Sequence, residues 1–100
     1  MRLPIHPGEV LADKLAELNI TPTELARQIA VPANRLSQII RGKRSITGDT
    51  ALRLGHWFGT SPQFWLNLQA AYGIRVAEPA VGPEIGRLPV RPGCEKRAGA

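Results

Sequence analysis

The apolar positions of residues 1–76 recur at helical spacing, and turn residues divide them into short segments. A first helix is expected over residues 7–18, where one face carries the apolar residues Val10, Leu11, Leu15 and Leu18. A separate face of the same segment carries an acidic residue at every fourth position, namely Glu9, Asp13 and Glu17. Asn19 and Ile20 close this segment.

A second and a third helix follow with a very short connection between them. Thr21 and Glu24 form a Thr-x-x-Glu capping box at the start of the second helix. Pro32 disfavours a helical conformation in the residue before it, which predicts a tight turn at that point. The third helix is expected over residues 33–41 and ends at Gly42. The inward faces of the two helices carry the apolar residues Leu25, Ala26, Ile29, Leu36, Ile39 and Ile40.

Two further helices complete the helical part of the chain. The fourth is expected to start at Thr47 or Gly48 and to end near Phe58, and the fifth to follow the capping residue Ser61 and end at about Gly73. From Ala77 onward, prolines and glycines are dense enough to predict a tail without regular structure. The sequence therefore predicts an all-α fold, with a five-helix domain over residues 1–76 and a flexible Pro/Gly-rich tail over residues 77–100.

The charge is concentrated in one part of the sequence. The chain has a formal net charge of +5 and an isoelectric point near 10.4, which favour an anionic partner. Between residues 27 and 44 there is no acidic residue but there are five basic ones, Arg27, Arg35, Arg41, Lys43 and Arg44. A solvated surface normally mixes both signs, so this stretch indicates a binding surface.

The second and third predicted helices meet the requirements of a DNA-binding helix-turn-helix unit, whose second helix lies in the major groove. Asn34 and Gln38 each offer an amide donor and acceptor that can pair with an adenine edge, and Arg41 can contact guanine or a phosphate. The other expected DNA contacts go to the sugar-phosphate backbone or allow close approach to the bases, and come from Thr23, Arg27, Ala33, Ser37, Lys43 and Arg44.

At these residues the chain resembles the lambda-repressor-like (Xre) helix-turn-helix superfamily. Three flanking segments, IHPGE over residues 5–9, RGKRSIT over 41–47 and GTSPQFWLNLQ over 59–69, resemble the HigA-type antitoxins, also called the VapI or plasmid-maintenance antidote group. The resemblance implies a five-helix, homodimeric DNA-binding antitoxin that represses its own operon at palindromic half-sites. It also implies a partner, a HigB toxin, which is a RelE-like ribonuclease acting on ribosome-bound mRNA.

Carried over by position, the family's DNA-contacting surface corresponds here to Pro32, Ala33, Asn34, Ser37, Gln38, Arg41, Lys43 and Arg44. Pro32 departs from the family pattern, because many relatives have a serine or threonine there that caps the third helix. Two classes of function remain open besides the antitoxin. One is a stand-alone Xre-family transcriptional regulator without a toxin, and the other is a module that binds only protein.

Two other groups of residues are candidates for protein contacts. The acidic row Glu9, Asp13 and Glu17 is either a solvated helix face or a docking surface for a basic toxin. Four aromatic residues fall within nine positions, namely Trp57, Phe58, Phe64 and Trp65. This clustering suggests one shared packing site, and any exposed part would suit a two-fold interface. The expected dimer contacts are Phe64, Trp65, Leu68 and Tyr72.

Catalytic and metal chemistry are not expected. His6 and His56 are far apart in the sequence and are taken to lack nearby carboxylate or cysteine partners, so no metal site is predicted. Cys94 is the only cysteine, which excludes an intrachain disulfide. No nucleophile–base pair or phosphate-binding glycine loop is present, so neither an enzyme nor a cofactor is predicted. Without a signal peptide or membrane span, a cytoplasmic location is expected.

Overall fold

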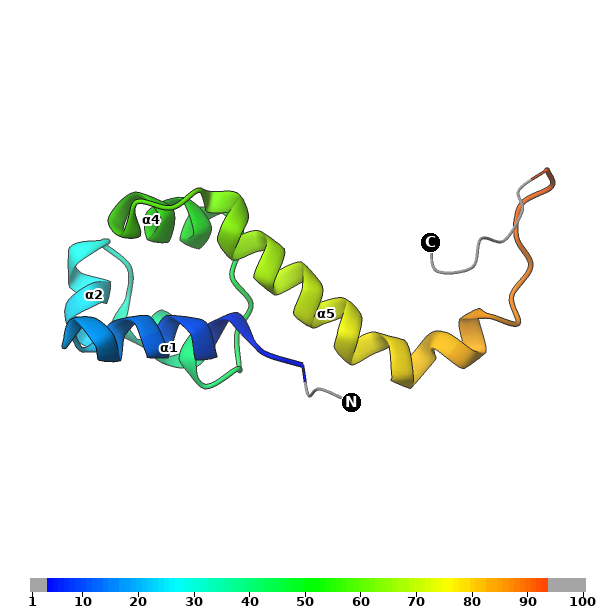
Figure 1. The fold of residues 1–100 in the computed structure, drawn as a ribbon, viewed down its shortest axis with the longest axis horizontal. Coiled ribbons are helices and arrows are strands. Elements are labelled where there is room, and N and C mark those ends of the chain that lie inside the picture. The colour runs from blue at the N-terminus through cyan, green and yellow to red at the C-terminus, as the bar shows by residue number, and fades with distance from the viewer. Residues whose placement is uncertain (1–3, 94–100) are drawn as a thin grey trace.

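The computed structural model describes residues 4–93, and this part of the chain forms five helices and no strand. The helices are α1 (Pro7–Leu18), α2 (Pro22–Gln28), α3 (Ala33–Ile40), α4 (Gly48–Phe58) and α5 (Pro62–Ile85). The first four gather at one end of the molecule, and α5 runs away from them (Figure 1). The molecule is therefore elongated, with a longest dimension of 52 Å. The all-α, five-helix prediction is confirmed.

One apolar core holds the helices together. Leu11 and Leu15 of α1 pack with residues of α2, α3 and α4, and the indole of Trp65 from α5 closes the core with no exposed surface. The predicted inward residues of α2 and α3 are buried, except that Ile40 is only partly so. Leu18 is a correction: it is the last residue of α1, and its side chain is 56% exposed.

The helix ends follow the capping residues of the sequence. The hydroxyls of Thr21 and Ser61 accept hydrogen bonds from the N–H groups of Glu24 and Phe64, at the starts of α2 and α5. The expected capping box at α2 is only half formed, since the Glu24 carboxylate instead accepts hydrogen bonds from the side chains of Arg27 and Gln28. A Thr-x-x-Glu pattern therefore predicted where the helix starts, but not where its glutamate points.

The fifth helix is much longer than the sequence suggested. It continues through Gly73 to Ile85, so both the predicted end near Gly73 and the loss of regular structure from Ala77 were wrong for this stretch. One glycine costs a helix only about 1 kcal/mol, and proline has a backbone φ that a helix accepts. Pro79 and Pro83 each lack the N–H of a helical hydrogen bond, and Figure 1 shows α5 bending in this region.

The far part of α5 leaves apolar side chains exposed. Ile74 is 60% exposed and Ile85 is 55% exposed. None of the helices formed by residues 4–93 is long and apolar enough to cross a membrane. Cys94 lies outside the described residues.

Candidate nucleic-acid interface

The outward face of α3 carries the side chains that the sequence assigned to base contacts. Leu36 and Ile39 are buried on the opposite face, which leaves Asn34 exposed and Gln38 half-buried on the outer side. Ala33 and Ser37 have short side chains on the accessible part of the same helix. Pro32 stands at the N-cap position without a side-chain capping bond, so the start of α3 lacks the hydroxyl that a serine or threonine would supply.

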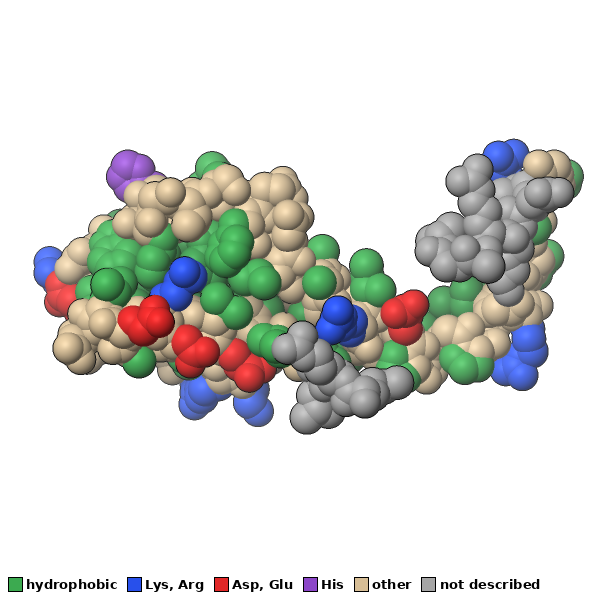
Figure 2. Space-filling model, in the orientation of Figure 1, with side chains coloured by type: hydrophobic (Ala, Val, Ile, Leu, Met, Phe, Trp, Pro, Cys, Tyr) green, Lys and Arg blue, Asp and Glu red, His purple; other side chains and the backbone are tan. Residues whose placement is uncertain are grey.

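The basic residues predicted for phosphate contacts follow immediately after α3. Gly42 adopts φ +74°, and the N–H of Lys43 donates to the carbonyl of Gln38 over 2.8 Å, so a Schellman motif ends the helix and turns the chain. Arg41, Lys43 and Arg44 are all exposed, and none forms an ion pair with another residue of 4–93. Lys and Arg side chains project from this edge of the molecule (Figure 2).

The other two predicted backbone contacts, Thr23 and Arg27, lie exposed on α2. The Arg27 guanidinium forms an ion pair with the Glu24 carboxylate one turn earlier. Hydrogen bonds from Arg27 and from Gln28 lower the pKa of Glu24, and the same ion pair raises the pKa of Arg27. Arg27 is thus partly neutralised in the free protein, unlike the residues after α3.

Arg35 does not belong to the free part of the basic stretch. Its guanidinium reaches across to the Asp49 carboxylate at the start of α4, with Nη1 and Oδ1 3.3 Å apart. Asp49 also accepts from Arg53 Nε over 2.8 Å, and this bond is the main reason that the pKa of Asp49 is lowered. The sequence suggested that the Arg35 charge was available for DNA, but in the structure it is paired with Asp49.

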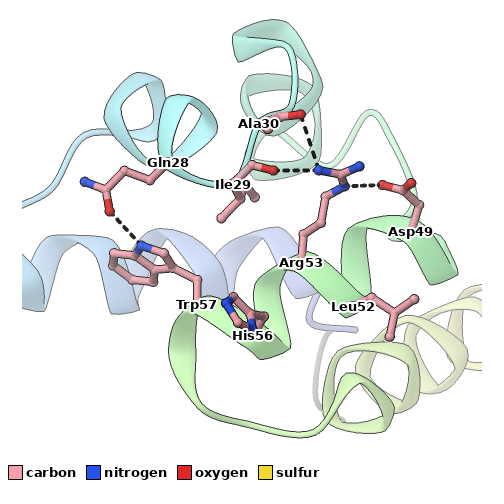
Figure 3. A pocket seen from close by; sticks show the side chains of 8 residues that line it. All are labelled: Gln28, Ile29, Ala30, Asp49, Leu52, Arg53, His56 and Trp57. Carbon is pink, nitrogen blue, oxygen red and sulfur yellow. Dashed lines mark hydrogen bonds and ion pairs between the residues drawn. The ribbon is translucent and has the colours of Figure 1, made fainter.

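Two close contacts with neighbouring elements lie at the two ends of α3. At its C-terminal end, a Cβ atom on Gly8 of α1 would lie 1.9 Å from the carbonyl oxygen of Ile39, so only glycine fits there. At its N-terminal end, Arg53 of α4 donates from Nη1 to the carbonyls of Ile29 and Ala30, over 2.8 and 3.4 Å. Figure 3 shows Arg53 between these carbonyls and Asp49.

The predicted protein contacts are exposed to different degrees. Asp13 and Glu17 are exposed on α1, where Figure 2 shows acidic side chains between the basic edge and a hydrophobic area. Trp65, in contrast, is fully buried in the chain's own core, so its assignment to a dimer contact is corrected. Phe64 is 37% exposed, and Leu68 and Tyr72 are half-buried.

The four clustered aromatic residues form one packing site, as predicted, with the ring centroids of successive pairs 4.8 to 5.5 Å apart. The ammonium group of Lys14 lies 5.8 and 5.7 Å from the ring centroids of Phe58 and Phe64, within the range of a cation–π contact. The cluster therefore joins α4 and α5 and extends onto α1.

His6 has a partner that the sequence reading missed. Its imidazole Nδ1 accepts from the N–H of Gly8 over 2.9 Å, and the backbone N–H of His6 donates to the Glu9 carboxylate over 3.1 Å, which makes a reciprocal cap for α1. Its ring packs edge-on against Tyr72 with centroids 4.8 Å apart. Burial lowers the pKa of His6, and the nearby Glu9 charge opposes this only in part. The statement that His6 lacks a carboxylate neighbour was therefore wrong.

Within residues 4–93, no three histidine, cysteine or carboxylate side chains gather around a common point. Sequence reasoning also missed Gly8, Asp49 and Arg53 as residues that position α3. The i, i+4 spacing of Asp49 and Arg53 signals their mutual ion pair. Nothing in the sequence signals the bonds from Arg53 to carbonyls of residues 29 and 30, because they join segments far apart in the chain.

Comparisons with known proteins identify the family of this chain. A family profile described as Helix-turn-helix matches residues 11–65. Virulence-associated protein I of Dichelobacter nodosus is 44% identical over 75 residues, which cover 74% of this chain and 69% of that protein. An addiction module antidote protein of a HigA family from Coxiella burnetii has a similar structure, with a TM-score of 0.86 and 50% identity over 91% of this chain and 99% of that one. The Pseudomonas aeruginosa antitoxin HigA, solved with the higBA promoter, gives a TM-score of 0.82 and 44% identity over the same shares.

Proposed function

The chain belongs to the helix-turn-helix family, among the HigA-type antitoxins, and from this premise we propose that it is a sequence-specific DNA-binding antitoxin that represses its own operon. The observation that carries the proposal is the outward face of α3, where Asn34 is exposed and Gln38 is half-buried, and the cations directly after the helix, which form no ion pair within residues 4–93. The similarity to an antitoxin solved with promoter DNA supports the same function.

In the proposed complex, α3 lies in the major groove and each group has one task. Asn34 and Gln38 pair with adenine edges through their amides, and Arg41 contacts guanine or a phosphate. Lys43 and Arg44 hold phosphates, since the turn at Gly42 presents both beside the helix. Ala33 and Ser37 permit close approach to the bases, Pro32 lies at the entry of the helix, and Thr23 and Arg27 contact the flanking backbone.

The test measures affinity for the DNA upstream of this protein's own gene and for a scrambled duplex, over a series of salt concentrations. With about six phosphate contacts per dimer, log affinity should fall with log salt at a slope near −5. Gln38→Ala should weaken binding to its own DNA by about tenfold and leave the scrambled duplex nearly unaffected. Equal, weak binding to both duplexes by the unchanged protein would reject the proposal.

A second set of variants separates direct contacts from net charge. Arg41→Ala should weaken binding, whereas Arg75→Ala removes the same charge from an exposed position on α5 and should not. Equal losses from both variants would mean that only the total charge matters, which contradicts a defined interface.

We also propose that the chain neutralises a HigB/RelE-like toxin through the acidic row Glu9, Asp13 and Glu17. Asp13 and Glu17 are exposed and free of ion pairs within residues 4–93, whereas Glu9 is also needed to cap α1. The double variant Asp13→Lys, Glu17→Lys should lose affinity for the protein encoded beside this gene, and Glu78→Lys on α5 is the matched control. If no such protein co-purifies, the alternative of a stand-alone Xre-family regulator is favoured.

A homodimer follows from the same proposal, since two half-sites about 34 Å apart need two reading helices. Of the predicted dimer contacts, Phe64, Leu68 and Tyr72 keep accessible surface, and the exposed apolar residues of α5 extend it. The mass in solution at micromolar concentration should be twice that of the chain, and a monomer mass would reject the dimer.

A further inference from the structure

The turn between α2 and α3 is held from outside by a single arginine of α4. Arg53 Nη1 donates to the carbonyl of Ile29 over 2.8 Å and to that of Ala30 over 3.4 Å. Its Nε donates to Asp49 Oδ1 over 2.8 Å. Figure 3 shows the guanidinium edge between the turn and the carboxylate, above an open hollow lined also by Leu52, His56 and Trp57. One planar side chain thus connects the turn to α4.

The turn has a particular need for such a contact. Ala30 adopts φ +59°, a left-handed conformation that costs a residue with a side chain about 1 kcal/mol or more. The two carbonyls that Arg53 binds follow the last turn of α2, where helices leave carbonyl groups without partners. A guanidinium there donates hydrogen bonds to both carbonyls, and its positive charge interacts favourably with the negative end of the helix dipole.

The same arginine is linked to the first turn of α3. Asp49 Oδ1 accepts a hydrogen bond from Arg35 Nη1 over 3.3 Å, in addition to that from Arg53. Arg53 therefore connects to the chain before α3 directly and to α3 itself through Asp49. Gly8 of α1 lies against Ile39 and Ile40, near the other end of α3, so the bonds of Arg53 and Asp49 are found at the end that carries Asn34.

We infer that Arg53 is a positioning residue for DNA reading: it fixes the turn and, through Asp49, the start of α3, so that Asn34 and Gln38 keep the register needed for base recognition. This inference rests on the proposed DNA-binding function. Base contacts through paired hydrogen bonds lose strength steeply with misalignment, whereas phosphate contacts from flexible cations tolerate it. Loosening the turn should therefore reduce discrimination between sequences more than it reduces overall affinity.

The test compares Arg53→Met, which removes the guanidinium, with Arg53→Lys, which keeps the charge but lacks the fork that reaches two partners at once. Both variants should bind their own upstream DNA about tenfold more weakly, with less than a twofold change on the scrambled duplex for Arg53→Lys. Arg75→Met, on α5, is the control for lost charge and should change neither. Wild-type discrimination in Arg53→Lys would overturn the inference, because charge alone would then suffice.

A measurement without DNA separates this inference from the proposed function. Hydrogen exchange of the Val31 and Arg35 amides, which donate to the carbonyls of Ala26 and Pro32, reports on the turn and on the first turn of α3. In Arg53→Met these amides should exchange at least fivefold faster, while the Ile20 amide after α1 stays unchanged. If the wild type does not prefer its own DNA, the proposed function fails, but the exchange rates still test the positioning. Unchanged exchange, or faster exchange with full discrimination, would overturn the inference.

Discussion

The two ends of α3 are held in different ways. At its C-terminal end the backbone touches α1, because Gly8 leaves no room for any side chain beside the Ile39 carbonyl. At its N-terminal end the helix is reached through polar groups, with Arg53 binding the preceding turn and Asp49 binding Arg35. One end is fixed by steric contact in the core, and the other by hydrogen bonds at the surface.

The two kinds of contact should affect different properties, namely the stability of the fold and the orientation of α3. A backbone contact in a packed core has one arrangement, and any larger residue disrupts the fold. Bonds from a half-buried guanidinium contribute little to stability, but under the inference above they decide the angle at which the first turn of α3 is presented. We therefore expect variants at the C-terminal end to change unfolding, and variants at the N-terminal end to change DNA recognition.

The largest effect is expected from Gly8→Ala. The added Cβ would lie 1.9 Å from a backbone oxygen, so α1 and α3 must move apart and lose core packing. The free energy of unfolding should fall by about 3 kcal/mol, measured by urea denaturation. Gly73→Ala is the matched control, since its Cβ would meet nothing within 4 Å, and it should leave stability unchanged or raise it by up to about 1 kcal/mol. Equal stability of the two variants would contradict the steric account.

A smaller effect at the same end comes from protonation of His6. Its imidazole caps α1 as an acceptor and is 6% exposed, and burial lowers its pKa, so the folded state disfavours the protonated form. The unfolded chain binds a proton near pH 6.5, and stability is therefore complete above that pH and falls as the pH drops below it. Between pH 7.5 and 5.5 the loss should approach about 1 kcal/mol, the usual value of an N-cap.

The control for this titration is His6→Asn, which keeps a capping acceptor but has no charge to gain. Its stability should be nearly flat over the same pH range. His56→Asn, at an exposed position on α4, should retain the wild-type pH dependence. A pH dependence that survives in His6→Asn would assign the effect to another group.

Much of the fold was predictable because it depends on local rules. Helical periodicity and the capping residues Thr21, Ser61 and Gly42 placed the starts of α2 and α5 and the end of α3 correctly. The continuation of α5 was not, because glycine and proline lower helix stability without forbidding the helix. The glycines and prolines of this stretch lower the stability of the helix, but α5 still forms through them.

The candidate site divides in a similar way. Exposed positions on α3 followed from its apolar face, so Asn34 and Gln38 were placed correctly on the outer side. The sequence did not show which cations of the basic stretch are paired within the protein, because Arg35 pairs with Asp49, which comes fourteen residues later. Contacts between segments distant in sequence, such as those of Arg53, require the fold to be known first.

Trp57→Phe sharpens the comparison at the N-terminal side. The Trp57 indole donates to Gln28 Oε1 over 2.8 Å, which links α4 to α2 but not to the turn itself. Losing this partly exposed hydrogen bond should lower the free energy of unfolding by about 0.5–1 kcal/mol, with no change in DNA discrimination. Thermal unfolding and duplex competition measure the two effects. A loss of discrimination similar to that of Arg53→Lys would mean that any link to α4 positions α3, and the special role of Arg53 would be lost.

The smallest effect is expected from Ala30→Gly, in the turn itself. Glycine removes the side-chain penalty of φ +59° but adds entropy to the unfolded chain, so the net gain should be about 0.5 kcal/mol. The melting temperature should rise by roughly 2–4 °C. The Arg53 bonds use carbonyls that this change keeps, so discrimination between duplexes should persist in Ala30→Gly and fall when Arg53→Lys is added. Lower stability in Ala30→Gly would show that the left-handed alanine carries no strain. The turn would then not need the Arg53 hydrogen bonds to keep its conformation.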